Sequence, residues 1–186
     1  QDVARYTITA TANPEEAGTV SLYPAGEEFD EGTELKLTAK KNFGYEFVNW
    51  TDAANNELGT EQTLNITLNA NTDIKANFKK LNTYSLDVTV NAPGKDYMVS
   101  ATPAATVVEG KNMYEEGTKV TLTASSNKIV TFNSWSNGET ASELQLDMTE
   151  NKSLEANFSA IDFIAGWDFV QKGNNGRKAD FAAEDN

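Results

Sequence analysis

The sequence contains no cysteine and no histidine in its 186 residues. The chain therefore cannot form a disulfide or a Cys/His zinc site. It also lacks the base that a catalytic group of the Ser-His-Asp type requires. No segment approaches the roughly 18 consecutive apolar residues of a membrane-spanning helix, so membrane insertion is not expected. Cations are scarce: 15 Lys and Arg stand against 28 Asp and Glu, which gives a net charge of −13. Such a surface repels phosphate backbones, so nucleic-acid binding is not expected either.

Without cysteine and histidine, carboxylates are the main side chains left that could bind a metal ion or perform acid–base chemistry. Glu27, Glu28, Asp30 and Glu31 form an acidic cluster whose oxygens suit Ca²⁺. The cluster lacks the D-x-[DN]-x-[DN]-G spacing of a calcium loop, so we expect a solvated acidic turn. Nothing in the pattern marks two carboxylates as facing one cleft, as glycoside hydrolysis would require. We expect no catalytic residue, no metal site and no cofactor.

The chain is an internal duplication. A Glu-Gly-Thr triplet occurs in each half and is followed, 19 positions after its Glu, by a tryptophan. The intervals between the matching blocks differ in length. From the opening Tyr to the triplet there are 25 positions in one copy and 32 in the other, and from Trp to the closing Phe there are 28 and 23. Such differences are typical of surface loops between packed strands. The matching blocks begin at Tyr6 and Tyr84, the triplets are residues 31–33 and 116–118, and the closing blocks are residues 71–78 and 151–158.

Hydrophobic residues alternate with polar ones throughout both copies. Residues 6–10, 64–68 and 74–78 follow this period of two, as do residues 84–90 and 144–148. A period of two places one face of a strand on a core and the other in water. It favours antiparallel sheets over buried parallel ones. We therefore predict an all-β fold of five or six short strands per copy, with little or no helix.

Large aromatic residues recur at matching positions and are the predicted core of each copy. Trp50 and Trp135 would suit stacking on sugars, but aromatic residues at a fixed spacing usually pack inside. Aromatic residues in turns or unmatched segments are freer to be exposed. The candidate ligand contacts are therefore Tyr45, Tyr97, Tyr114 and Trp167. The predicted core residues are Phe47, Trp50, Phe78, Phe132, Trp135 and Phe158.

The order of these motifs resembles the divergent internalin-B B-repeat family. The resemblance rests on Gly-Thr-Val-Ser at 18–21, the triplet followed by Leu-x-Leu-Thr-Ala, the Gly44-Tyr45-x-Phe47-x-x-Trp50 motif and the closing Ala-Asn-Phe at 76–78. It covers residues 4–81 and 82–160. The second copy departs from it, with Lys-Ile-Val-Thr at 128–131 in place of the Gly-Tyr lead-in. The resemblance implies two tandem β-grasp-like repeats arranged end to end. It also implies no known catalytic residues and a place in a secreted or surface protein of a bacterium.

Residues 161–186 do not continue the repeat. Their opening, Gly-Trp-Asp-Phe at 166–169, is similar to domain openings that follow such repeats in secreted proteins that carry pectate-lyase-like domains. We interpret this segment as the start of a following domain or a partly ordered end.

Two functions remain open at this point. The first is a monomeric, elongated, extracellular spacer, display or adhesion unit whose signal peptide has already been removed. The second is an accessory carbohydrate-binding module. The expected partners are a polysaccharide or a host or cell-surface protein. An exposed row of aromatic residues on one sheet face would favour the second function, and polar outer faces would favour the first.

Overall fold

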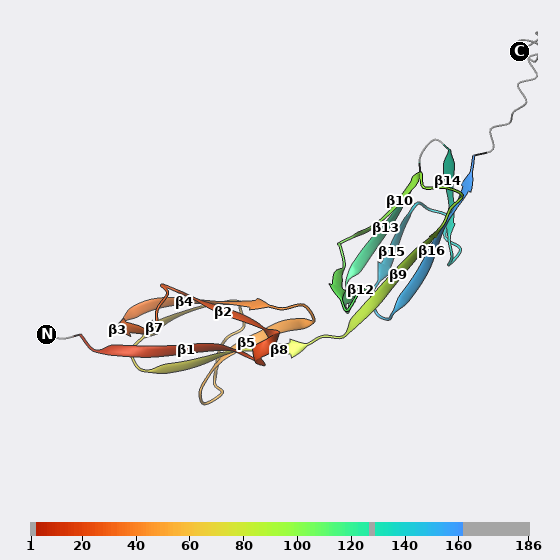
Figure 1. Cartoon of the computed structure of the whole chain (residues 1–186). Coiled ribbons are helices and arrows are strands. Elements are labelled where there is room, and N and C mark those ends of the chain that lie inside the picture. The colour runs from red at the N-terminus through yellow and green to blue at the C-terminus, as the bar shows by residue number, and fades with distance from the viewer. Residues whose placement is uncertain (1–2, 127–128, 162–186) are drawn as a thin grey trace, which may run out of the picture.

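The computed structural model describes residues 3–126 and 129–161. Figure 1 shows two separate lobes, one red to yellow and one green to blue, joined by the short connector between β8 and β9. Each lobe holds one copy of the repeat. The molecule is all-β, and its described helical content is one 3-10 turn, η1 (Glu15–Ala17). The expected all-β fold of two tandem repeats with little or no helix is confirmed.

The first repeat consists of two sheets that enclose its core. One sheet has the strand order β3-β1-β8-β5-β6, and the other has the order β2-β4-β7. A 3-10 turn, η1, connects the sheets between β1 and β2. The strands are β1 (Arg5–Asn13), β2 (Gly18–Tyr23), β3 (Glu28–Asp30), β4 (Thr33–Lys41), β5 (Tyr45–Asp52), β6 (Glu57–Gly59), β7 (Thr63–Leu68) and β8 (Thr72–Lys80).

The second repeat has the same arrangement of two sheets, but its extra strands lie at a different place in the repeat. Its sheets have the orders β11-β12-β9-β16-β14 and β10-β13-β15. The longer interval before its Glu-Gly-Thr triplet forms the β11–β12 hairpin, whereas the longer Trp-to-Phe interval of the first repeat forms β6. The strands are β9 (Thr83–Asn91), β10 (Tyr97–Thr102), β11 (Thr106–Val108), β12 (Lys111–Glu115), β13 (Lys119–Ser126), β14 (Val130–Trp135), β15 (Glu143–Asp147) and β16 (Lys152–Ala160).

The sequence favoured antiparallel pairing, but one pairing in each repeat is parallel. The first long strand pairs in parallel with the last one, β1 with β8 and β9 with β16. These strands still alternate, because their sheet packs on the core with only one face. Two asparagines join the ends of each parallel pair. Asn13 Nδ2 donates to Asn77 Oδ1 at 2.8 Å, and Asn91 Nδ2 donates to Asn157 Oδ1 at 3.2 Å.

The predicted aromatic core is confirmed for Trp50, Phe78, Trp135 and Phe158, and Phe47 and Phe132 pack against it half-buried. Trp50 and Trp135 are 0% and 1% exposed, and each lies in the hydrophobic cluster of its own repeat. Each indole N–H donates to a backbone carbonyl oxygen, from Trp50 to Glu61 at 2.8 Å and from Trp135 to Ala141 at 2.9 Å. Within each repeat, aromatic pairs of tilted or edge geometry connect the three predicted core aromatics, with ring centroids 5.2–5.6 Å apart. No helix in the described residues has the length and hydropathy that crossing a membrane requires.

Candidate functional site

The four candidate ligand contacts do not form one surface. Tyr45 opens β5 and packs half-buried against the core of the first repeat. Tyr97 opens β10 in the second repeat, where its ring lies 5.2 Å from that of Phe158. Trp167 lies outside the described residues. Among the described residues, only Tyr97 and Tyr114 share a local environment.

The expectation that Tyr114 is exposed was wrong. Its side chain is 3% exposed in the core of the second repeat, and its hydroxyl donates to the carbonyl oxygen of Pro103 at 2.9 Å. The cause is β12, the strand that carries Tyr114: it pairs with the start of β9 and so turns the ring inward. Burial raises the pKa of the Tyr114 phenol above its ordinary value, because the buried phenolate would lose its hydration.

Tyr97 and Tyr114 line a groove of about 490 Å³ in the second repeat. The core-facing side chains of β9 and β10 form most of its walls, and Ser100 and Asn112 supply its polar side chains. No carboxylate or amine lines it, so the groove offers apolar contact and a few hydrogen bonds but no acid–base pair. Its lining residues are Leu86, Val88, Val90, Tyr97, Val99, Ser100, Ala101, Ala104, Ala105, Asn112, Tyr114 and Leu122.

The acidic cluster at 27–31 lies beside the start of β1, and its charge is partly neutralised from within the first repeat. Arg5 contacts Glu28 and Asp30 at 3.3 and 3.4 Å, and all three side chains are at least half exposed. Across residues 3–126 and 129–161, no three Asp or Glu side chains gather in a way that would hold a metal ion. The cluster therefore has the character of an exposed ion-pair network.

The outer faces of the sheets carry no row of aromatic residues in the described part of the chain. Tyr23 is the single aromatic among the exposed large hydrophobic residues there, at 76% exposure. The outward positions of the long strands are instead mostly threonine, lysine and acidic residues, as in β4 and β8. Polar outer faces are the pattern expected of a spacer, display or adhesion unit and not of a carbohydrate-binding module.

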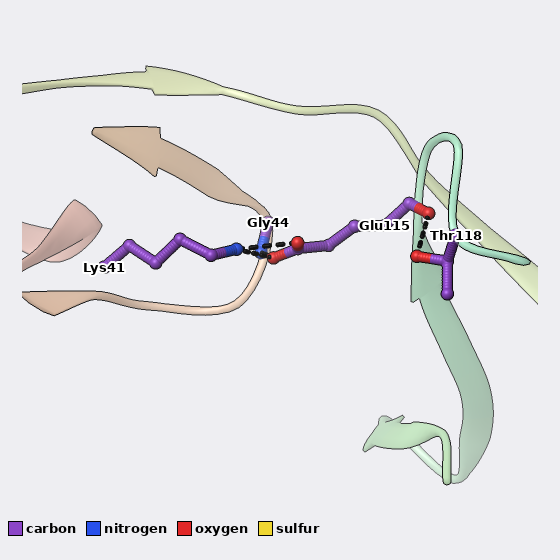
Figure 2. Close-up of polar contacts among 4 residues, drawn as sticks. All are labelled: Lys41, Gly44, Glu115 and Thr118. Carbon is purple, nitrogen blue, oxygen red and sulfur yellow. Dashed lines mark hydrogen bonds and ion pairs between the residues drawn. The ribbon is translucent and has the colours of Figure 1, made fainter. Parts of the chain in front are cut away.

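The contact between the two repeats centres on Glu115, at the end of β12. Its carboxylate accepts from Lys41 Nζ at 2.6 Å and from the backbone N–H of Gly44 at 2.8 Å (Figure 2). Lys41 ends β4, and Gly44 lies in the turn before β5, so both partners belong to the first repeat. The Lys41 and Glu115 side chains are 38% and 22% exposed.

The sequence did not identify this contact, because Lys41 and Glu115 are 74 positions apart. Glu115 directly precedes the Glu-Gly-Thr triplet of the second repeat, as Asp30 precedes that of the first. An acidic side chain at the same place in both copies was the available signal. The triplet was interpreted only as a marker of the repeat.

Comparisons with known proteins agree with the duplicated fold. A family model described as the divergent InlB B-repeat domain matches residues 7–82 and 88–162. No curated protein matches the chain. Among solved structures, the Bacillus anthracis TIE protein matches at 8% identity and a TM-score of 0.26. That match covers 87% of this chain and 35% of the other. The family model covers most of the chain in two tandem regions, and the chain therefore belongs to the divergent InlB B-repeat family.

Proposed function

We propose that this chain is a non-catalytic spacer module of a larger protein that is secreted by a bacterium or displayed on its surface. The observation that carries the proposal is the end-to-end arrangement. Each repeat encloses its own core, and a two-residue connector, Leu81 and Asn82, separates β8 from β9. Repeats that contact only their neighbours in sequence extend a chain by a fixed increment, which is what a spacer does.

Charge and chemistry support this role. The net charge of −13 keeps such modules apart from one another and from anionic surfaces, which favours a monomer. The strands present polar outer faces, and the groove of the second repeat has no acid–base pair. Catalysis by this module would therefore have to use isolated carboxylates or lysines. Divergent B-repeats as a family are generally non-catalytic.

Small-angle scattering of the whole chain tests the spacer role. We expect a two-lobed, elongated particle with a distance distribution that has a shoulder at the separation of the lobes. A matched variant with a long Gly/Ser insertion between Leu81 and Asn82 should give a broader distribution, because flexible linkers sample many separations. A compact, near-spherical particle from the unmodified chain would contradict the proposal, as would turnover of a polysaccharide, ester or phosphoester substrate.

Accessory carbohydrate binding is the second candidate, and the groove is the observation that favours it. Aromatic and aliphatic walls with a few polar groups are typical of small-ligand sites, and Tyr97 and Tyr114 belong to such a wall. Binding to a panel of plant and mucosal polysaccharides tests this role. The role predicts retention that Tyr97→Ala abolishes, while Tyr23→Ala, in the other repeat, leaves it intact. Retention of no polysaccharide by the unmodified chain would refute it.

A further inference from the structure

The two repeats use the same backbone contacts at their ends. At the start of each repeat, the Glu of the triplet donates its N–H to a carbonyl just before the first strand: Glu31 to Ala4 at 2.7 Å, and Glu116 to Asn82 at 2.9 Å. At the end of each repeat, Leu81 donates to Gly44 at 2.8 Å and Ile161 donates to Ile129 at 3.0 Å. These backbone contacts therefore do not distinguish the junction between the repeats from the outer ends.

At the junction between the repeats, one carboxylate is held from two directions. Figure 2 shows Glu115 reaching from the second repeat toward the Lys41 ammonium and the Gly44 N–H of the first. The backbone of Glu115 is itself fixed, because Thr118 Oγ1 donates to its carbonyl oxygen at 2.7 Å. Charge-assisted hydrogen bonds of this kind are short and directional. A flexible lysine alone would leave the angle between the two repeats open. The Gly44 N–H is held in a folded turn, so its hydrogen bond to Glu115 restricts that angle.

The equivalent positions at the outer ends are occupied differently. At the start of the first repeat, Asp30 takes the place of Glu115 and is paired with Arg5 of the same repeat at 3.4 Å. At the end of the second repeat, Ser126 and Ile129 take the places of Lys41 and Gly44, counted from the triplet. The residues that join the repeats, Lys41, Gly44 and Glu115, are thus present at the inner junction and replaced by others at the described outer ends.

We infer that Glu115 fixes the relative orientation of the two repeats. We further infer that the start of a repeat bearing this Glu fits a preceding repeat with a lysine and a glycine at the positions of Lys41 and Gly44. On the preceding repeat, the Glu carboxylate recognises a lysine ammonium and a backbone N–H that come from residues three positions apart. Gly44 has a φ of +84°, which favours glycine, so the turn that presents this N–H is itself encoded in the sequence. The inference goes beyond the spacer role, because it holds whatever the module carries.

Because the chain has no cysteine, two spin labels can be attached at chosen sites without a competing reaction. Thr19→Cys in β2 and Gln145→Cys in β15 place one label on an exposed position of each repeat. Pulsed dipolar spectroscopy on this labelled protein should give one narrow distance distribution. Glu115→Gln keeps the shape of the side chain but removes its charge. We expect it to reduce the population at the main distance relative to other distances by about tenfold, in line with the loss of a charged hydrogen bond.

Glu116→Gln is the matched control. The Glu116 carboxylate is also at the junction, but it accepts from Asn82 Nδ2 at 2.9 Å, within the connector. We expect the distribution of this variant to stay narrow, and Lys41→Met to broaden it as Glu115→Gln does. An unmodified protein with a broad distribution would overturn the inference, as would Glu115→Gln and Glu116→Gln variants that behave alike. Neither result contradicts the spacer role, which scattering tests separately. Unchanged thermal unfolding midpoints would show that the variants remain folded.

Discussion

Among the glycines that the structure describes, Gly18 has the least room for a side chain. A Cβ added to it would lie 2.5 Å from the backbone oxygen of Lys40 and 2.6 Å from Cζ of Phe78. Gly18→Ala should therefore destabilise the protein by about 1–3 kcal/mol, because β2 must move away from β4. Gly94→Ala is the control, since a Cβ there meets no atom within 4 Å and should change stability by less than about 0.5 kcal/mol. Urea unfolding measures both, and equal effects would contradict the prediction.

The turn between β5 and β6 makes the stability of the first repeat depend on pH through Asp52. Hydrogen bonds from the side chain and backbone of Asn56, together with one from the Ala54 N–H, lower the pKa of the Asp52 carboxyl. A lowered pKa in the folded state means that the carboxylate stabilises the turn above its unfolded pKa. That contribution is lost as the pH falls through the folded value. Carbon-detected NMR titration should place the Asp52 midpoint below the ordinary aspartate value, and Asn56→Ala should raise it. An Asp52 midpoint that this substitution leaves in place would contradict the assignment.

Residue-level predictions from the sequence succeeded where two copies were available for comparison. Trp50 and Trp135 share one offset from their triplets, and both are buried. Tyr114 has no such counterpart, because it belongs to the β11–β12 hairpin, which occupies the longer interval of the second repeat. Its burial depends on a pairing between β12 and β9 that no local pattern contains. The repeat thus revealed the shared core but not what one copy had added to it.

At the scale of elements, the Glu-Gly-Thr triplet is a defined turn. Gly32 and Gly117 have φ angles of +82° and +80°, and the Thr hydroxyl of each triplet donates to the carbonyl oxygen three residues earlier at 2.7 Å. The glycine N–H donates across the sheet to Leu68 or Met148, at 2.8 Å in both repeats. The triplet therefore directs the chain into β4 and β13, which are central strands of their sheets.

Replacing either triplet glycine should cost a similar amount in both repeats. No atom lies within 4 Å of a Cβ built at Gly32 or Gly117, so the penalty of Gly→Ala comes from the backbone angle alone, about 1–2 kcal/mol. Gly117→Asn should cost less, because asparagine tolerates positive φ better than alanine does. Chemical unfolding of the three variants compares the costs. An alanine variant as stable as the unmodified chain would show that the turn relaxes without penalty.

Strands were predictable from the sequence, but their partners were not all predictable. Alternation identified most of the long strands correctly, including β1, β7, β8 and β9. It could not show that β1 lies beside β8, because a period of two describes which face is buried and says nothing about direction. Short strands such as β3 and β6 were also beyond prediction, since three residues carry no period.

At the scale of the whole molecule, the tandem arrangement of the repeats was predictable from the sequence. The side chains that join the repeats were not. Duplication implied neighbouring units with a short connector, and the family resemblance supplied the fold of each. The pairing of Lys41 with Glu115 depends on how two folded units meet, and that information lies in neither repeat by itself. The bounds 4–81, 82–160 and 161–186 remain predictions, and the last of these lies outside the described residues except for Ile161.

The two repeats should unfold as separate units, because their hydrophobic clusters have no residue in common. Trp50→Ala removes a fully buried ring from the first core and should cost that repeat about 3–5 kcal/mol, a large part of a small domain's stability. Trp135→Ala should do the same to the second. Nitrogen–proton NMR spectra of each variant should keep the dispersed signals of the unmodified repeat and lose those of the altered one. Signals next to the junction, at Gly44 or Glu115, should shift as well, since the partner that each contacts is lost. If either substitution collapses the signals of both repeats together, the cores are coupled through the junction more strongly than these polar contacts allow, and the molecule is a single folding unit.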